Sequence, residues 1–77
     1  MANIRLDDVT VHIDESLDQE ARNRLVSHLR SLDGVVSVEG SETTPHLFIV
    51  RFDESHITTK NILKVILGEN LHAELLG

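Results

Sequence analysis

Hydrophobic residues in this chain of 77 residues follow two different periods in turn, and this alternation limits the folds that the chain can adopt. Residues 9–14 alternate apolar with polar side chains, which is the period-two pattern of a half-buried strand. Residues 46–52 are expected to form another strand, with Phe48, Val50 and Phe52 on one face and Leu47, Ile49 and Arg51 on the other. One helical stripe lies between them, formed by Leu17, Ala21, Leu25, Leu29 and Leu32. The two periods therefore predict strands and helices that share one core.

Turn and cap residues mark the expected ends of the first helix. Ser16 is followed three residues later by Gln19, which matches a capping box and predicts a helix that begins near Leu17. Gly34 is expected to end this helix in the left-handed conformation. A second strand is then expected over residues 35–39, followed by a turn over residues 40–45.

The C-terminal half repeats this order. Thr58 is a plausible N-cap, and Ile57 and Ile62 have the spacing of a hydrophobic staple. Gly68 or Asn70 is expected to end the second helix, and residues 71–76 form a closing strand. Ile4 and Leu6 also alternate with polar residues, but on the opposite parity from the strand that follows. Residues 1–8 are therefore either a bulged extension of that strand or a partly ordered arm, and the arm is the preferred expectation.

The resulting order is strand, helix, strand, strand, helix, strand, which predicts an α+β fold of the ferredoxin-like βαββαβ type. Right-handed crossovers then give a four-stranded antiparallel sheet in the order 4-1-3-2, with both helices on one face. Residues 9–77 form a single domain in this interpretation. The other face of the sheet is expected to stay open.

Several short motifs add a family resemblance over about residues 9–75. They are Leu25, Leu29 and Leu32, Gly34-Val35, Ser37-Val38-Glu39, Val50-x-Phe52-Asp53, Ile57-Thr58 and Ile62-x-x-x-Ile66. With these residues the chain resembles a heavy-metal-associated domain, the module of copper and mercury chaperones and of metal-transporting P-type ATPases. The resemblance implies the ferredoxin-like fold.

The functional motif of that family is missing. The family carries Gly-Met-x-Cys-x-x-Cys between the first strand and the first helix, whereas Asp18 and Ala21 stand here where the cysteines would be, and the chain has no cysteine. Neither a carboxylate nor a methyl group replaces a thiolate that binds a soft metal. The resemblance therefore implies the fold without its thiolate chemistry.

Charge and composition exclude several functions. The net charge of −6, with scattered basic residues, argues against nucleic-acid and anionic-membrane partners. No apolar run is long enough for a membrane span or a signal peptide, so a cytoplasmic location is expected. No nucleophile elbow, phosphate loop or carboxylate pair in a cleft is recognisable, so we expect no enzyme activity.

The open sheet face is the main candidate site. Leu47 and Ile49 are expected to point outwards there, with Arg51, His12 and Glu39 around them. Adjacent exposed aliphatic residues of this kind favour a protein partner or self-association. The alternative is that the N-terminal arm, with Ile4 and Leu6, folds over this surface.

A metal site is the second hypothesis, although no cofactor is expected under the first. His12 and His72 are predicted to become cross-strand neighbours on the open face, with Asp14 or Glu74 as an oxygen ligand, for weak binding of Zn, Ni or Cu(II). The acidic residues Asp14, Glu15, Asp18 and Glu20 are another set of oxygen ligands, but stabilisation of the helix dipole explains them better. A third hypothesis is a small-ligand regulatory domain of the ACT-like type, which would need a glycine-rich first loop that this chain lacks.

Overall fold

The elements follow one another in the predicted order. The computed structural model describes residues 5–76. Its elements are β1 (Leu6–Ile13), α1 (Gln19–Arg30), β2 (Val35–Gly40), β3 (Leu47–Asp53), α2 (Thr59–Leu67) and β4 (Ala73–Leu76). The prediction of an α+β chain with four strands and two helices is therefore confirmed. No helix within residues 5–76 is both long and apolar enough to cross a membrane.

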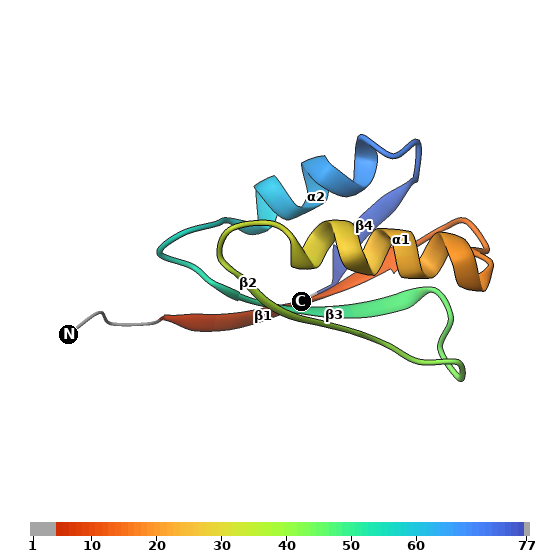
Figure 1. Ribbon diagram of the computed structural model, residues 1–77, viewed down its shortest axis with the longest axis horizontal. Coiled ribbons are helices and arrows are strands. Elements are labelled where there is room, and N and C mark those ends of the chain that lie inside the picture. Colours follow the sequence, from red (N-terminus) through yellow and green to blue (C-terminus); the bar gives the residue numbers. More distant parts are fainter. Residues whose placement is uncertain (1–4, 77) are drawn as a thin grey trace.

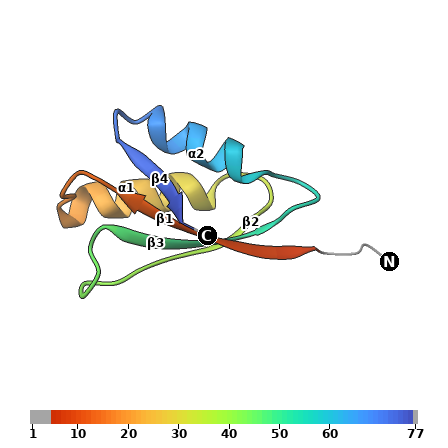
Figure 2. The same ribbon diagram turned by 180° about the vertical axis from the view of Figure 1, so that it is seen from behind.

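The sheet has the predicted topology. Its strand order is β2-β3-β1-β4, and each neighbouring pair is antiparallel. Both helices lie on one side of the sheet (Figure 1), and the view from behind shows the same arrangement (Figure 2). The described part of the chain therefore forms two layers, with a helix layer on one face only.

The core lies between the sheet and the helices. Val9, Val11 and Ile13 of β1 and Phe48, Val50 and Phe52 of β3 supply its sheet side. The helices and the loop before α2 supply Leu25, Leu29, Ile57, Ile62 and Ile66. Successive strand residues point to opposite faces, so the side chains between these strand residues face away from the helices.

Strand β1 starts earlier than predicted. Leu6 of β1 pairs with Asp53 of β3, and the two strands stay paired as far as His12, which lies opposite Leu47. The side chain of Leu6 is largely exposed, so the extension is formed by backbone pairing and not by burial of an apolar side chain. The preferred expectation of an arm up to residue 8 is therefore corrected for residues 6–8, which belong to β1. Leu6 also lies at the opposite end of β3 from Leu47 and does not fold over it. Ile4, the other residue of the expected cover, lies outside the described residues.

Helix α1 starts later than predicted, because Asp18 rather than Ser16 is its N-cap. Asp18 has extended backbone angles, and its Oδ1 accepts a hydrogen bond from the backbone N–H of Ala21 at 2.8 Å. The helix also ends at Arg30, before Gly34. Both ends therefore lie inside the predicted range.

Gly34 has a role other than ending the helix. Its φ is +97°, and a Cβ atom here would lie 2.9 Å from Cβ of His56 and 2.9 Å from Cγ2 of Ile57. The glycine thus permits both the left-handed backbone and the close approach of the loop before α2.

Helix α2 and the last strands agree more closely with the sequence. Thr58 caps α2 as predicted, with its Oγ1 accepting from the N–H of Asn61 at 3.2 Å. Asn70, with φ of 62°, takes the left-handed conformation, whereas Gly68 does not. Strand β3 is displaced by one residue from the predicted range, and β4 is shorter than residues 71–76.

The two candidate caps of α1 can be separated by mutation. Asp18→Ala removes the side-chain acceptor of the first turn and is expected to lower the free energy of unfolding by about 1 kcal/mol. Ser16→Ala is expected to change it by less than about 0.5 kcal/mol. Urea denaturation of both variants measures the difference, and a larger loss in Ser16→Ala would contradict the assignment of Asp18 as the cap.

Candidate functional site

The side of the sheet without helices is the candidate functional site, and we call it the open face. The strand register groups its side chains into rows that run across the sheet. The first row is Glu74, His12 and Leu47, the second is Leu76, Thr10, Ile49 and Glu39, and the third is Asp8, Arg51 and Ser37. The five residues placed on this face from the sequence, Leu47, Ile49, Arg51, His12 and Glu39, therefore all lie on it.

Apolar side chains occupy the middle of the open face. Ile49 and Leu76 flank Thr10 in the second row, and each is 42% exposed. Leu47 is half-buried in the neighbouring row. A shallow hollow beside them is lined by Thr10, Glu39, Ser41, Thr44, Leu47 and Ile49. Within residues 5–76, no helix or loop covers this apolar centre.

Charged side chains surround that centre, and most of them are acidic. Asp8, Glu39 and Glu74 are exposed on three different strands, and Arg51 is the only cation in these rows. The open face therefore combines an apolar centre with a negative rim.

Two carboxylates in the loop between β1 and α1 form structural hydrogen bonds. Asp18 caps α1 through the 2.8 Å bond to Ala21, so this predicted metal ligand is directed at the helix end. Glu15 reaches across to the start of β4: its Oε1 accepts from the backbone N–H of His72 at 2.8 Å, and its Oε2 lies 2.6 Å from Nδ1 of the same residue. The loop is thereby fixed to the segment that leads into β4.

The contact between Glu15 and His72 shifts both pKa values. The hydrogen bonds from the side chain and backbone of His72 hold the pKa of Glu15 below its ordinary value of 4.5. The hydrogen bond to Glu15, and then its negative charge, raise the pKa of His72 above 6.5. The ionised pair is therefore the favoured state in mildly acidic solution.

The predicted pairing of His12 with His72 is wrong. Strand register places Glu74 opposite His12, and His72 precedes the first residue of β4. The register differs by two residues from the predicted one, so His72 lies beside Asp14, whose N–H donates to the carbonyl oxygen of His72 at 2.8 Å. His72 is instead the partner of Glu15.

A different group of potential metal ligands forms around His12. His12, Asp14 and Glu74 each offer one ligand atom, and these atoms all lie within 4.8 Å of one another. Asp14 and Glu74 are the two oxygen ligands that the sequence offers for His12, and both lie near it. Asp18 and His72 are not members of this group.

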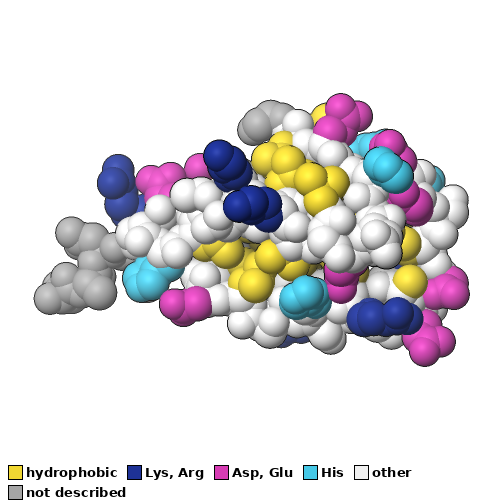
Figure 3. Space-filling view, turned by 90° about the horizontal axis from the view of Figure 1, so that it is seen from above, with side chains coloured by type: hydrophobic (Ala, Val, Ile, Leu, Met, Phe, Trp, Pro, Cys, Tyr) yellow, Lys and Arg dark blue, Asp and Glu magenta, His cyan; other side chains and the backbone are white. Residues whose placement is uncertain are grey.

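Each of the five histidines lies near an oxygen atom, although the Nδ1 of His12 forms no hydrogen bond within residues 5–76. Carboxylate contacts are made by His12 with Asp14 at 3.3 Å, His28 with Glu69 at 2.9 Å, His56 with Asp53 at 3.1 Å and His72 with Glu15 at 2.6 Å. The fifth, His46, uses Nδ1 to contact the carbonyl oxygen of Ile13 at 2.8 Å. On the helix side, histidines are visible next to acidic side chains (Figure 3).

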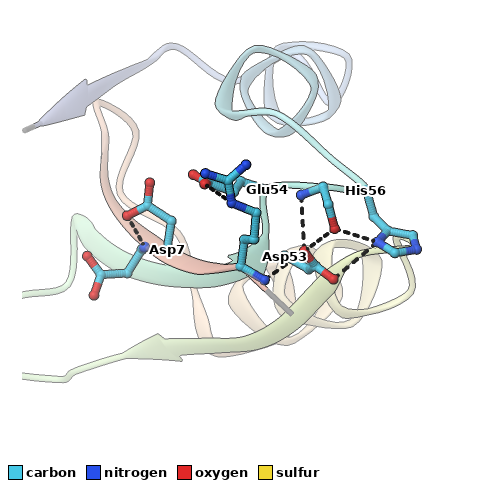
Figure 4. Close-up of polar contacts among 7 residues, drawn as sticks. Asp7, Asp53, Glu54 and His56 are labelled. Carbon is cyan, nitrogen blue, oxygen red and sulfur yellow. Dashed lines mark hydrogen bonds and ion pairs between the residues drawn. The ribbon is translucent and has the colours of Figure 1, made fainter. Parts of the chain in front are cut away.

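Asp53 is the centre of a polar network that hydrophobic periodicity does not reveal. Its carboxylate accepts hydrogen bonds from the N–H and hydroxyl of Ser55 and from the N–H of Arg5, and it contacts His56 (Figure 4). The bonds from Ser55 are the main reason that the pKa of Asp53 lies below 3.8. The Asp-x-Ser spacing signals the local turn. The network is structural, since it joins the end of β3 to the residue before β1.

A scan against protein-family models finds no family that matches, and a search of curated proteins finds no similar sequence.

The Glu15–His72 pair predicts a defined pH dependence. The raised pKa of His72 gives stability that is complete below pH 6.5 and is lost as the pH rises through the raised value. The lowered pKa of Glu15 gives stability that is present above pH 4.5 and is lost as the pH falls through the lowered value. Both contributions are therefore present between pH 4.5 and 6.5.

Glu15→Gln is expected to lower the pKa of His72, although the charge of Asp14 still raises it, and to flatten the pH dependence of stability in this window. NMR titration of the imidazole protons measures the pKa, and chemical denaturation at several pH values measures the stability. Glu69→Gln is the matched control, because Glu69 contacts His28 instead. An unchanged His72 pKa in Glu15→Gln would contradict the pairing.

Proposed function

We propose that this chain is a non-catalytic protein-interaction domain that binds its partner through the open face. The observation that carries the proposal is the uncovered apolar centre at Ile49 and Leu76 in the middle row of the sheet. Apolar side chains at the centre of a surface, inside a polar rim, are the usual arrangement of a protein interface. A cytoplasmic location is part of the proposal.

The fold assigned in this proposal is ferredoxin-like, of the heavy-metal-associated kind. The order of elements and the strand order support it. The two positions that hold cysteines in that family are Asp18 and Ala21, which here share the capping hydrogen bond of α1. This bond gives the first loop a structural role, which favours a domain that works without a thiolate metal site.

The charge of the rim favours a partner of a different kind over a second copy. Two copies that met through this face would bring Asp8, Glu39 and Glu74 of each chain towards the same set in the other, with Arg51 as the only cation in the rows of the open face. Like charges that meet at an interface oppose binding. The proposed occupant is therefore a protein segment with apolar anchors between Lys or Arg residues.

Peptide selection tests this surface even though the partner is unidentified. A random peptide library displayed on phage is selected on the whole chain, and the binders are then measured by fluorescence polarisation. The proposal predicts peptides in which aliphatic or aromatic residues alternate with Lys or Arg. Ile49→Asp is expected to weaken their binding by about tenfold or more, since tenfold corresponds to about 1.4 kcal/mol and loss of a central anchor residue costs about 2 kcal/mol.

Leu67→Asp is the matched control for that substitution. Leu67 is 46% exposed, similar to Ile49, but it lies on α2 on the helix side. Its variant should bind the peptides as the unmodified chain does, and circular dichroism confirms that both variants fold. Equal loss in both variants, or a dimer of the unmodified chain that Ile49→Asp dissociates in sedimentation, would overturn the proposed partner.

A further inference from the structure

A three-residue group at one end of the open face has the composition of a metal site. His12 lies on β1 and faces Glu74 on the neighbouring strand β4, while Asp14 follows two residues after His12, just past the end of β1. One ligand atom from each residue lies within 4.8 Å of those of the other two. The group therefore offers one imidazole nitrogen and two carboxylate oxygens.

The ring of His12 has an unused nitrogen. Its Nδ1 is shielded from solvent, and no residue among 5–76 forms a hydrogen bond with it. The nearest acidic atom, Oδ1 of Asp14, is 3.3 Å away, which is within ion-pair range but without hydrogen-bond geometry. Most shielded polar atoms in folded proteins have a partner, and a bound ion is one explanation for an atom without one.

A second histidine holds this ring in place. His46 stacks on His12, with ring centroids 5.8 Å apart and planes inclined by 25°. The Nδ1 of His46 is in turn 2.8 Å from the carbonyl oxygen of Ile13, which can only accept a hydrogen bond. His46 is therefore fixed as the donor in that bond, and the stacked pair keeps His12 beside Asp14. A ligand whose orientation is fixed in advance binds a metal more readily.

We propose that His12, Asp14 and Glu74 bind a divalent first-row transition metal ion such as Zn²⁺ or Co²⁺. A mixture of imidazole and carboxylate ligands suits these ions, whereas Ca²⁺ and Mg²⁺ prefer oxygen alone, and Cu⁺ prefers sulfur. Ligand atoms around a tetrahedral zinc ion are about 3.4 Å apart, because each bond is about 2.1 Å long. The exposed carboxylates of Asp14 and Glu74 are free to close the remaining distance by changing rotamers. Water completes the coordination shell.

The other histidines of the described chain are poorer candidates. His28, His56 and His72 each contact one carboxylate, and within residues 5–76 only the group around His12 brings three potential ligands together. This difference supplies an internal control. The proposed site does not depend on the docking of a protein partner, because its ligands all come from this chain.

Cobalt binding and zinc-dependent stability test the site on the whole chain after chelator treatment. Titration with Co²⁺ is expected to give a saturable visible absorption for one site, and Zn²⁺ is expected to raise the melting temperature. His12→Gln and Glu74→Gln should each weaken Co²⁺ binding by about tenfold or more. Glu74 is exposed, so its variant remains informative if His12→Gln fails to fold.

His28→Gln is the control, because it removes an exposed histidine with a single carboxylate partner on another part of the surface. It should bind Co²⁺ as tightly as the unmodified chain. The proposal is overturned by the absence of saturable Co²⁺ binding up to millimolar concentration. It is also overturned if Glu74→Gln binds Co²⁺ with unchanged affinity, or if His28→Gln loses as much affinity as Glu74→Gln does.

Discussion

The central constraint on this molecule is that two helices cover one side of a four-stranded sheet. The buried strand residues all point towards those helices, from Val9 on β1 to Phe52 on β3. Because side chains alternate along a strand, burying one set forces the other set outwards. Residues 5–76 form no other helix or strand that could cover these outward-facing side chains. The open face is therefore a direct consequence of how the core is built.

The proposed protein-binding surface and the proposed metal site both lie on the open face. Ile49 is exposed because its neighbours Phe48 and Val50 are buried, and His12 faces Glu74 because Val11 and Ile13 fill the core. The acidic loop before α1 has different tasks, since Asp18 caps the helix and Glu15 holds the start of β4. Local structure thus accounts for these two carboxylates, while Asp14 and Glu74 have no comparable hydrogen bond to the backbone of residues 5–76.

Hydrophobic periodicity predicted the elements and the face that carries Ile49, and the rule of right-handed crossovers then predicted the strand order. It could not predict where elements begin, because Ser16 and Asp18 are both good caps and only the backbone angles decide between them. The start of β1 at Leu6 was not predicted, because backbone pairing between strands needs no buried side chain. The contact between Glu15 and His72 joins residues 57 positions apart. A register that differs by two residues from the expected one places Glu74, and not His72, opposite His12. Such pairs depend on register, which a hydrophobic pattern leaves open by a residue or two.

The accessibility of Ile49 in the whole chain tests most directly whether the open face is free to bind. Methyl-labelled protein with a soluble nitroxide gives the attenuation of each methyl signal, with Ile62 as a fully buried reference and Leu67 as an exposed one. We predict that the Ile49 signal is attenuated about as strongly as that of Leu67, independently of protein concentration. Protection of Ile49 equal to that of Ile62 would contradict a free open face, because the face would then already be covered by this chain or by a second copy.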